Sequence, residues 1–497
     1  MTKRLATKEQ LETIYKIMGD NISSIYPSFI SAIELYKYLN VIEEDSCKKR
    51  LWIDLVRVYY FVLFCHLDII SVLRAEFRAK TAGEKRIHLK YLNVIITEMI
   101  KAMFGFSKKK YSLWNSLCNN PDAALQVDDK DKIEELVRTF KKTYCNSDSK
   151  DYRDYAIHYD NDPLKVYDFL SNLSEDAEAI KVFNFLAILH ELLQLINRLS
   201  GEHQLPLDFF QIADNSPWET LNVFPDKNNN LLLQTEKKIV SYCNTLDRIV
   251  RSYRLPNIVE QKFGIKGISS QLQPLKDTIH PEIHLLFIYI DICCAVTAYL
   301  SSEYYIERQL NLRHLNVVVY EGFKKLYGFA EKKRKAANVK SEKQHVYFWK
   351  DVLFPILMSS DDDNLKSKAQ EVEHQLQTLA QDSTINDEDL RNMSVHIREK
   401  RKDYIPKFTD KLIKMNPFFE MNKALKLLSL LPNIMDLNKE ATNIKYSDVK
   451  ALQEKEIESM KNQIEGVLDL IQQSCKDISV QESITDSTNR LLSFFKL

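Results

Sequence analysis

Apolar residues recur along most of this chain at the three- and four-residue spacing of amphipathic helices. The spacing predicts long helices over residues 63–80 and 86–106. We expect the second to stop at Gly105, because glycine commonly ends a helix. A charged amphipathic helix is predicted over 128–144. Further helices are expected within 1–62 and over 164–171, 175–199 and 232–252.

An internal duplication underlies this pattern. A shift of 223 positions places residues 63–110 on residues 286–333 without a gap, and 16 of these 48 pairs are identical. LFCHLDII at 63–70 meets LFIYIDIC at 286–293. A repeat of this period is too long for a solenoid, so the sequence predicts two related domains.

Two short strings occupy equivalent places in these halves, RDYAIHYD at 153–160 and RNMSVHIR at 391–398. Each has an arginine, a polar residue after it, and a histidine five positions on. Arginine binds phosphate in a fork and histidine transfers protons near neutral pH, a combination suited to phosphodiester cleavage. The candidate catalytic residues are therefore Arg153, Asp154, His158, Arg391, Asn392 and His396.

The same spacing also arises by chance. Arg198 and His203 repeat it, and Arg308 and His314 are one residue further apart. Neither pair has a mate in the other half. For a single motif the favoured interpretation is a hydrogen-bonded core histidine beside a bridging arginine, whereas two matched motifs favour catalysis.

Composition narrows the fold and the chemistry. Only 9 of the 497 residues are glycine, which argues against Gly-rich phosphate loops and predicts an all-α protein. The formal net charge is zero, so any RNA contact must be local. The 8 cysteines form no C-x-x-C pair and no zinc pattern, which indicates reduced thiols in a cytoplasmic protein without metal or cofactor. The most apolar run, 285–300, carries Asp291 and falls short of a membrane span, so we expect a core helix there and no membrane contact.

Other charged and aromatic residues have two possible roles. Asp68, Asp291, Glu98 and Glu321 lie on apolar helices, where structural ion pairs are the expected role; Glu98–Lys101 and Glu321–Lys324 have i,i+3 spacing. Basic runs near the motifs would be solvated or would follow an RNA backbone. Tyr155, Tyr159 and Tyr404 would stack on bases or belong to the core. The candidate RNA-binding residues are Arg398, Lys400, Arg401, Lys402, Lys109 and Lys110.

The two motifs resemble the R-polar-x-x-x-H signature of the HEPN superfamily, the higher eukaryote and prokaryote nucleotide-binding domains. The paired arrangement is similar to that of abortive-infection proteins and of the nuclease halves of type VI CRISPR effectors. The resemblance implies tandem helical bundles that form an intramolecular pseudo-dimer, with both motifs at one site. It also implies a metal-independent endoribonuclease in antiphage defence or toxin-like growth arrest. The expected domains are N-terminal helices at 1–54, bundles at 55–200 and 232–432 joined by a linker at 201–231, a charged insertion at 331–344, and a helical tail at 433–497.

Two alternatives stay open from sequence. One alternative is a non-catalytic helical scaffold. The other is an RNA- or protein-binding subunit of a defence complex that a partner activates. The partners implied are an RNA substrate, a regulatory protein or small RNA, and a second copy of the chain through the helical periodicity of 446–497.

Overall fold

The protein is helical throughout the part that the structure, a computed structural model, describes. That part comprises residues 8–42, 47–105, 112–145, 159, 162–205, 229–263, 275–329, 346–382, 385, 387, 390–392 and 404–474. Over these residues the chain forms no strand, so the all-α prediction is confirmed. The charged insertion predicted at 331–344 and residues 206–228 of the predicted linker lie outside the described residues.

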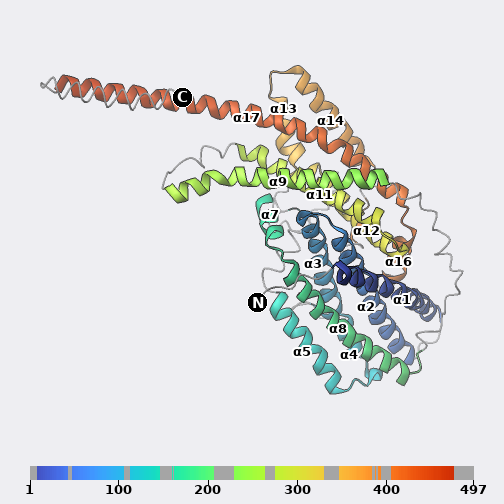
Figure 1. Ribbon diagram of the computed structural model, residues 1–497. Coiled ribbons are helices and arrows are strands. Elements are labelled where there is room, and N and C mark those ends of the chain that lie inside the picture. Colours follow the sequence, from blue (N-terminus) through green and yellow to red (C-terminus); the bar gives the residue numbers. More distant parts are fainter. Residues whose placement is uncertain are drawn as a thin grey trace, which may run out of the picture.

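The helices fall into two groups that follow one another in sequence (Figure 1). The first unit contains α1 (Lys8–Val41), α2 (Cys47–Arg78), α3 (Ala82–Phe104), α4 (Leu113–Cys118), η1 (Pro121–Ala123), α5 (Val127–Tyr144), α7 (Pro163–Asn172) and α8 (Glu175–Glu202). The second unit contains α9 (Asn229–Phe263), α11 (Lys276–Ser301), α12 (Tyr305–Leu326), the π-helix η3 (Phe348–Leu353), α13 (Phe354–Met358), α14 (Asp363–Gln381), α16 (Tyr404–Lys414) and α17 (Pro417–Ser474).

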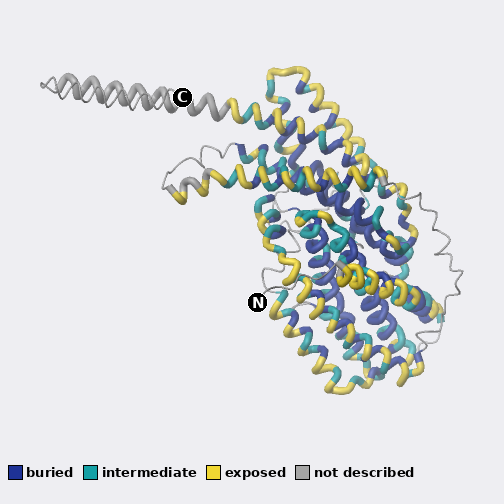
Figure 2. The backbone as a smooth tube through the Cα atoms, viewed as in Figure 1, coloured by how far each residue is buried: buried dark blue, intermediate teal, exposed yellow. Residues whose placement is uncertain are grey.

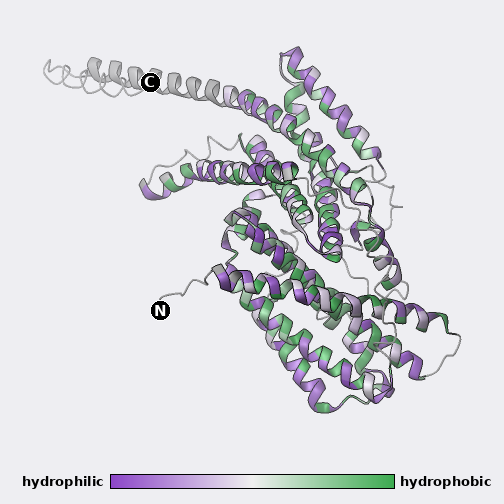
Figure 3. Ribbon diagram, turned by 45° about the vertical axis from the view of Figure 1, so that its right-hand side comes forward, coloured by the Kyte–Doolittle hydropathy of each residue, from purple (hydrophilic) through white to green (hydrophobic). Residues whose placement is uncertain are grey.

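The two units pack their helices in the same way. In the first, α2 lies against α1, α3 and α8; in the second, α11 lies against α9, α12 and α17. Helix α1 therefore corresponds to α9, although the sequence placed residues 1–54 before the first bundle. Figure 3 shows hydrophobic and hydrophilic residues alternating along most of the helices, as expected of amphipathic helices.

The last helices of the units also correspond in detail. Every buried apolar residue of α8 has a buried counterpart in α17, 242 positions further on. Helix α17 continues without a break past residue 432, where the sequence analysis ended the second bundle. The matched residues are Val182, Phe185, Ile188, Leu189, Leu192, Leu195, Ile196 and Leu199 in α8, and Ala424, Leu427, Leu430, Leu431, Ile434, Leu437, Asn438 and Ala441 in α17.

Local chemistry sets the ends of the central helices. The Thr81 hydroxyl accepts a hydrogen bond from the backbone N–H of Glu84 at the start of α3, which satisfies a donor that the helix leaves unpaired. Helix α3 ends at Gly105, whose φ of 67° lies in the left-handed region that glycine tolerates, so the predicted stop is confirmed. Gly328 follows α12 with a φ of 80°.

Two of the most apolar helices, α2 and α11, form the core. α2, α8 and α11 are long and apolar enough to cross a membrane by length and composition, so the prediction that the run at 285–300 is too short was wrong. The most apolar windows of α2 and α11 are nevertheless 94% buried inside the protein, as Figure 2 shows for the interior. This burial supports the prediction that the run at 285–300 is a core helix, and it shows the same for α2.

Candidate functional site

Two buried ion pairs join the units in a reciprocal arrangement. Asp68 of α2 binds Arg313 of α12 across the interface, and Asp291 of α11 binds Lys90 of α3. Asp291 lies 223 positions after Asp68, and Arg313 lies 223 positions after Lys90, so each pair is the counterpart of the other. All four residues are at most 4% exposed. The expectation of structural ion pairs at Asp68 and Asp291 is confirmed, and the geometry is that of a pseudo-twofold contact.

Electrostatics around the first pair favour the charged carboxylate. Burial alone would raise the pKa of Asp68, but the positive charge of Arg313 holds it below its usual value. The His314 Nε2 atom lies 3.3 Å from the Asp68 carboxylate, and burial lowers the pKa of this histidine. The sequence analysis did not identify Lys90 and Arg313. The duplication places these two basic residues at equivalent positions of two apolar helices, and that match could have indicated them.

Tyr159 ties the first motif string to the second unit. The Tyr159 hydroxyl donates a 2.6 Å hydrogen bond to Oδ2 of Asp291, and the side chain is buried. Burial raises its pKa well above the usual value, and the charges of Asp291 and Glu321 add to this effect. Of the two roles considered for Tyr159, the core role is therefore the one observed. Its φ of 45° gives the chain a left-handed turn directly after His158.

The second motif string begins in a buried, fully engaged position. The Arg391 guanidinium binds one carboxylate oxygen of Glu321 through Nε and Nη2, and its Nη1 donates a 2.8 Å hydrogen bond to Oδ1 of Asn392. Its central carbon lies 5.8 Å from the ring centroid of Tyr320. Glu321 is thus in the expected ion pair, but its partner is Arg391, whereas the sequence suggested Lys324.

The corresponding carboxylate of the first unit meets the sequence expectation. Glu98 binds Lys101 one turn along α3, with a nitrogen–oxygen distance of 3.2 Å. Glu321 on α12 binds Arg391, which is 70 positions away in the sequence. Glu321 binds Arg391 at the start of the second motif string, and its charge adds to the raised pKa of Tyr159 in the first string.

The remaining candidates cannot be placed in the same way. Arg153, Asp154, His158 and His396 lie outside the described residues, as do Tyr155 and the basic residues Arg398, Lys400, Arg401, Lys402, Lys109 and Lys110.

The chance matches to the motif have ordinary structural roles. Arg198 forms ion pairs with Asp129 and Glu202 at the edge of the first unit. Arg308 donates a 3.0 Å hydrogen bond to the carbonyl oxygen of Ser302 near the start of α12. Neither arginine is needed to explain a phosphate site, so these pairs serve as controls for the two motifs.

No metal site is found in the described part of the chain, where His, Cys, Asp and Glu do not gather in groups of three or more. No protein-family model, curated protein or solved structure matches the chain.

Proposed function

We propose that the chain is a metal-independent endoribonuclease of the HEPN type, with a composite site of two R-x-x-x-x-H motifs in tandem HEPN-like bundles. The observation that carries the proposal is the occurrence of the two motifs at equivalent places of a duplicated chain, whose two units meet through reciprocal buried ion pairs. In this proposal the two motifs meet at the contact between the units and act on one phosphodiester.

The chemistry follows from the residue types. One imidazole, of His158 or His396, takes the proton of the ribose 2′-OH, and the other gives a proton to the leaving 5′-oxygen. General acid–base help of this kind contributes about 10²–10⁴-fold to a rate. Arg153 and Arg391 stabilise the negative charge that develops on the phosphate, with Asp154 and Asn392 orienting them.

Glu321 has a positioning role in this scheme. An arginine side chain has many rotamers, and its ion pair with a buried carboxylate fixes the guanidinium before substrate arrives. Because DNA lacks the 2′-OH, the scheme predicts cleavage of RNA and not of DNA. The proposed setting is the cytoplasm, in antiphage defence or toxin-like growth arrest, under control of a regulatory protein or small RNA.

The test is incubation of the purified full chain with mixed RNA in EDTA. We expect fragments ending in 2′,3′-cyclic phosphate, and loss of cleavage in both His158→Ala and His396→Ala. His203→Ala, from the chance match with the same spacing, is the matched control and should retain activity. Cleavage by the double variant His158→Ala/His396→Ala would overturn the assignment.

A second candidate is a non-catalytic helical scaffold, or an RNA- or protein-binding subunit of a defence complex. The burial of Arg391 and its bond to Glu321 favour it, since buried arginines commonly bridge helices. This alternative predicts no cleavage by the wild-type chain under any of these conditions. It further predicts that Glu321→Gln lowers stability without changing any nucleic-acid product.

A further inference from the structure

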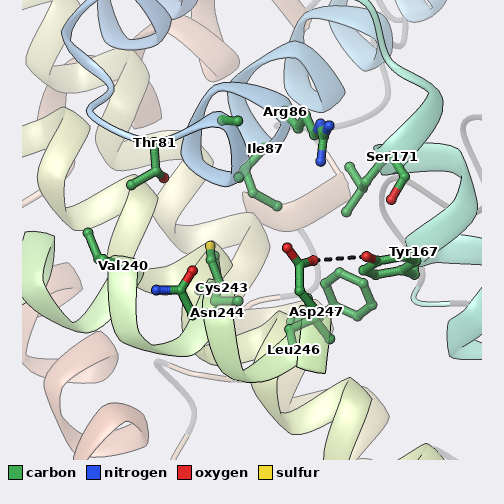
Figure 4. Close-up of a pocket in the computed structure, with 15 residues that line it drawn as sticks. Thr81, Arg86, Ile87, Tyr167, Ser171, Val240, Cys243, Asn244, Leu246 and Asp247 are labelled. Carbon is green, nitrogen blue, oxygen red and sulfur yellow. Dashed lines mark hydrogen bonds between the residues drawn. The ribbon is translucent and has the colours of Figure 1, made fainter. Parts of the chain in front are cut away.

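A pocket of about 180 Å³ opens where the two units meet (Figure 4). The start of α3 and one face of α7 form the wall from the first unit, and α9 and α11 form the wall from the second. Apolar side chains line much of it, namely Ile87, Leu170, Val240, Leu246, Phe287 and Ile290. An apolar cavity of about 150 Å³ is large enough for benzene, so this space fits one aromatic ring.

The duplication explains why the pocket is open on this side. Thr81, Ala82 and Gly83 begin α3, whereas Tyr304, Tyr305 and Ile306 stand at the equivalent positions of α12. There the larger residues occupy the space: Ile306 is 1% exposed, and the Arg74 guanidinium lies 5.1 Å from the ring centroid of Tyr304. One copy of this contact is thus closed by Tyr304 and Ile306, whereas the other, which begins with Thr81, Ala82 and Gly83, leaves a pocket beside Cys243.

Polar groups at the pocket are unevenly satisfied. The Tyr167 hydroxyl donates a 2.9 Å hydrogen bond to Asp247, which is drawn as a dashed line in Figure 4. Arg86, by contrast, makes no hydrogen bond or ion pair with any residue that the structure describes, although it lines the pocket. Burial raises the pKa of Cys243, and the positive charge of Arg86 partly offsets this increase.

We propose that this pocket binds a small molecule with one aromatic ring and one anionic group. The ring packs on Ile87, Leu246 and Phe287, and a carboxylate or phosphate takes the guanidinium of Arg86 as its partner. The amide of Asn244 and the hydroxyl of Ser171 lie at the same pocket and add hydrogen-bonding capacity. The ligand touches both units, so its binding stabilises their assembled form.

The test uses three one-ring probes with the full-length chain in isothermal titration calorimetry: benzoate, phenyl phosphate and the uncharged benzamide. We expect at least one anion to bind with a Kd on the order of 1 mM, as suits fragments of this size. Benzamide should bind about tenfold or more weakly, because it lacks the charge-assisted bond to the guanidinium. Comparison of benzoate with phenyl phosphate identifies the anion.

Two variants and one control distinguish binding in this pocket from non-specific binding. Arg86→Gln should weaken the binding of the anions about tenfold or more and leave the binding of benzamide unchanged. The control is Arg248→Gln, which removes an exposed cation of α9 that does not line the pocket and should not change the binding of any probe. Ala82→Tyr restores the residue type of the closed copy at an exposed position and should abolish binding of all three probes. Thermal melts verify that each variant folds.

The proposal is overturned if no probe shows saturable binding, if benzamide binds as tightly as both anions, or if the anions bind Arg86→Gln as they bind the wild type. It is independent of the ribonuclease assignment, because every readout is a binding constant.

Discussion

The Lys90–Asp291 ion pair permits a quantitative test of how the two units hold together. Both side chains are at most 3% exposed, so neither charge can return to water when its partner is removed. Removing one member of such a pair typically costs about 3–5 kcal/mol, because the other charge stays buried and unpaired. Asp291→Leu also removes the acceptor of the Tyr159 hydroxyl, which adds about 1–3 kcal/mol.

The double variant distinguishes pairing from packing. Lys90→Met/Asp291→Leu leaves no buried charge from this pair, and replacing a whole buried pair by apolar residues is often neutral or stabilising. We therefore expect the double variant to be more stable than either single variant. The coupling energy from the cycle should be about 3 kcal/mol or more in magnitude.

Urea unfolding followed by circular dichroism at 222 nm and by tryptophan fluorescence provides the four free energies. Lys85→Met is the matched control on the same helix: its ammonium lies 3.0 Å from Glu175, but the two side chains are 31% and 55% exposed. A surface pair of this kind contributes about 0–1 kcal/mol. A cost of Lys90→Met no greater than that of Lys85→Met, or additive effects of Lys90→Met and Asp291→Leu, would contradict this expectation.

Three further predictions concern single side chains. Burial lowers the pKa of His88 from 6.5 to about 3, so between these pH values only the unfolded state binds a proton at this histidine. The free energy of unfolding, measured in urea, should therefore fall as the pH drops from 6.5 toward 3. His88→Leu should reduce the slope of this decline by up to ~1.4 kcal/mol per pH unit. Tyr159→Phe should cost about 1.5–3 kcal/mol of unfolding free energy through its lost bond to Asp291, and a change under ~0.5 kcal/mol would contradict this. Gly105→Ala should cost about 1–3 kcal/mol at its positive φ, whereas Gly201→Ala, in a helix with open space around it, should not destabilise in the same melts.

Local signals in the sequence predicted the helices well. The periodicity of apolar residues predicted α3 and α5 to within a few residues, and glycine marked the end of α3. It did not reveal that α1 is the counterpart of α9, because the aligned identities begin only at residue 63. Packing on α2 and α11 shows this correspondence, and it depends on contacts that no local pattern records.

The ion-pair partners of the buried charged residues were harder to predict than the fact that these residues form ion pairs. Glu321 was expected to form an ion pair, and it does. The predicted partner was Lys324, one turn away on the same helix, whereas the observed partner is Arg391, 70 positions away in the sequence. Spacing along a helix predicts only the nearby candidate. Lys90 escaped notice for the same reason: its carboxylate belongs to the other unit, so a single helix contains no sign of the pairing.

The reciprocal pairs also explain how the two copies can differ at their edges. A displacement of one unit along the other would separate Asp68 from Arg313 and Asp291 from Lys90 together, and would leave four buried charges unpaired. With an unpaired buried charge costing several kcal/mol, misaligned arrangements are strongly disfavoured, and we infer that these pairs fix how the units meet. Once the centre fixes the arrangement, positions away from it need not be conserved between the copies. The replacement of bulky residues by Thr81, Ala82 and Gly83 is such a change, and the pocket it opens lies beside Ile290, the residue before Asp291.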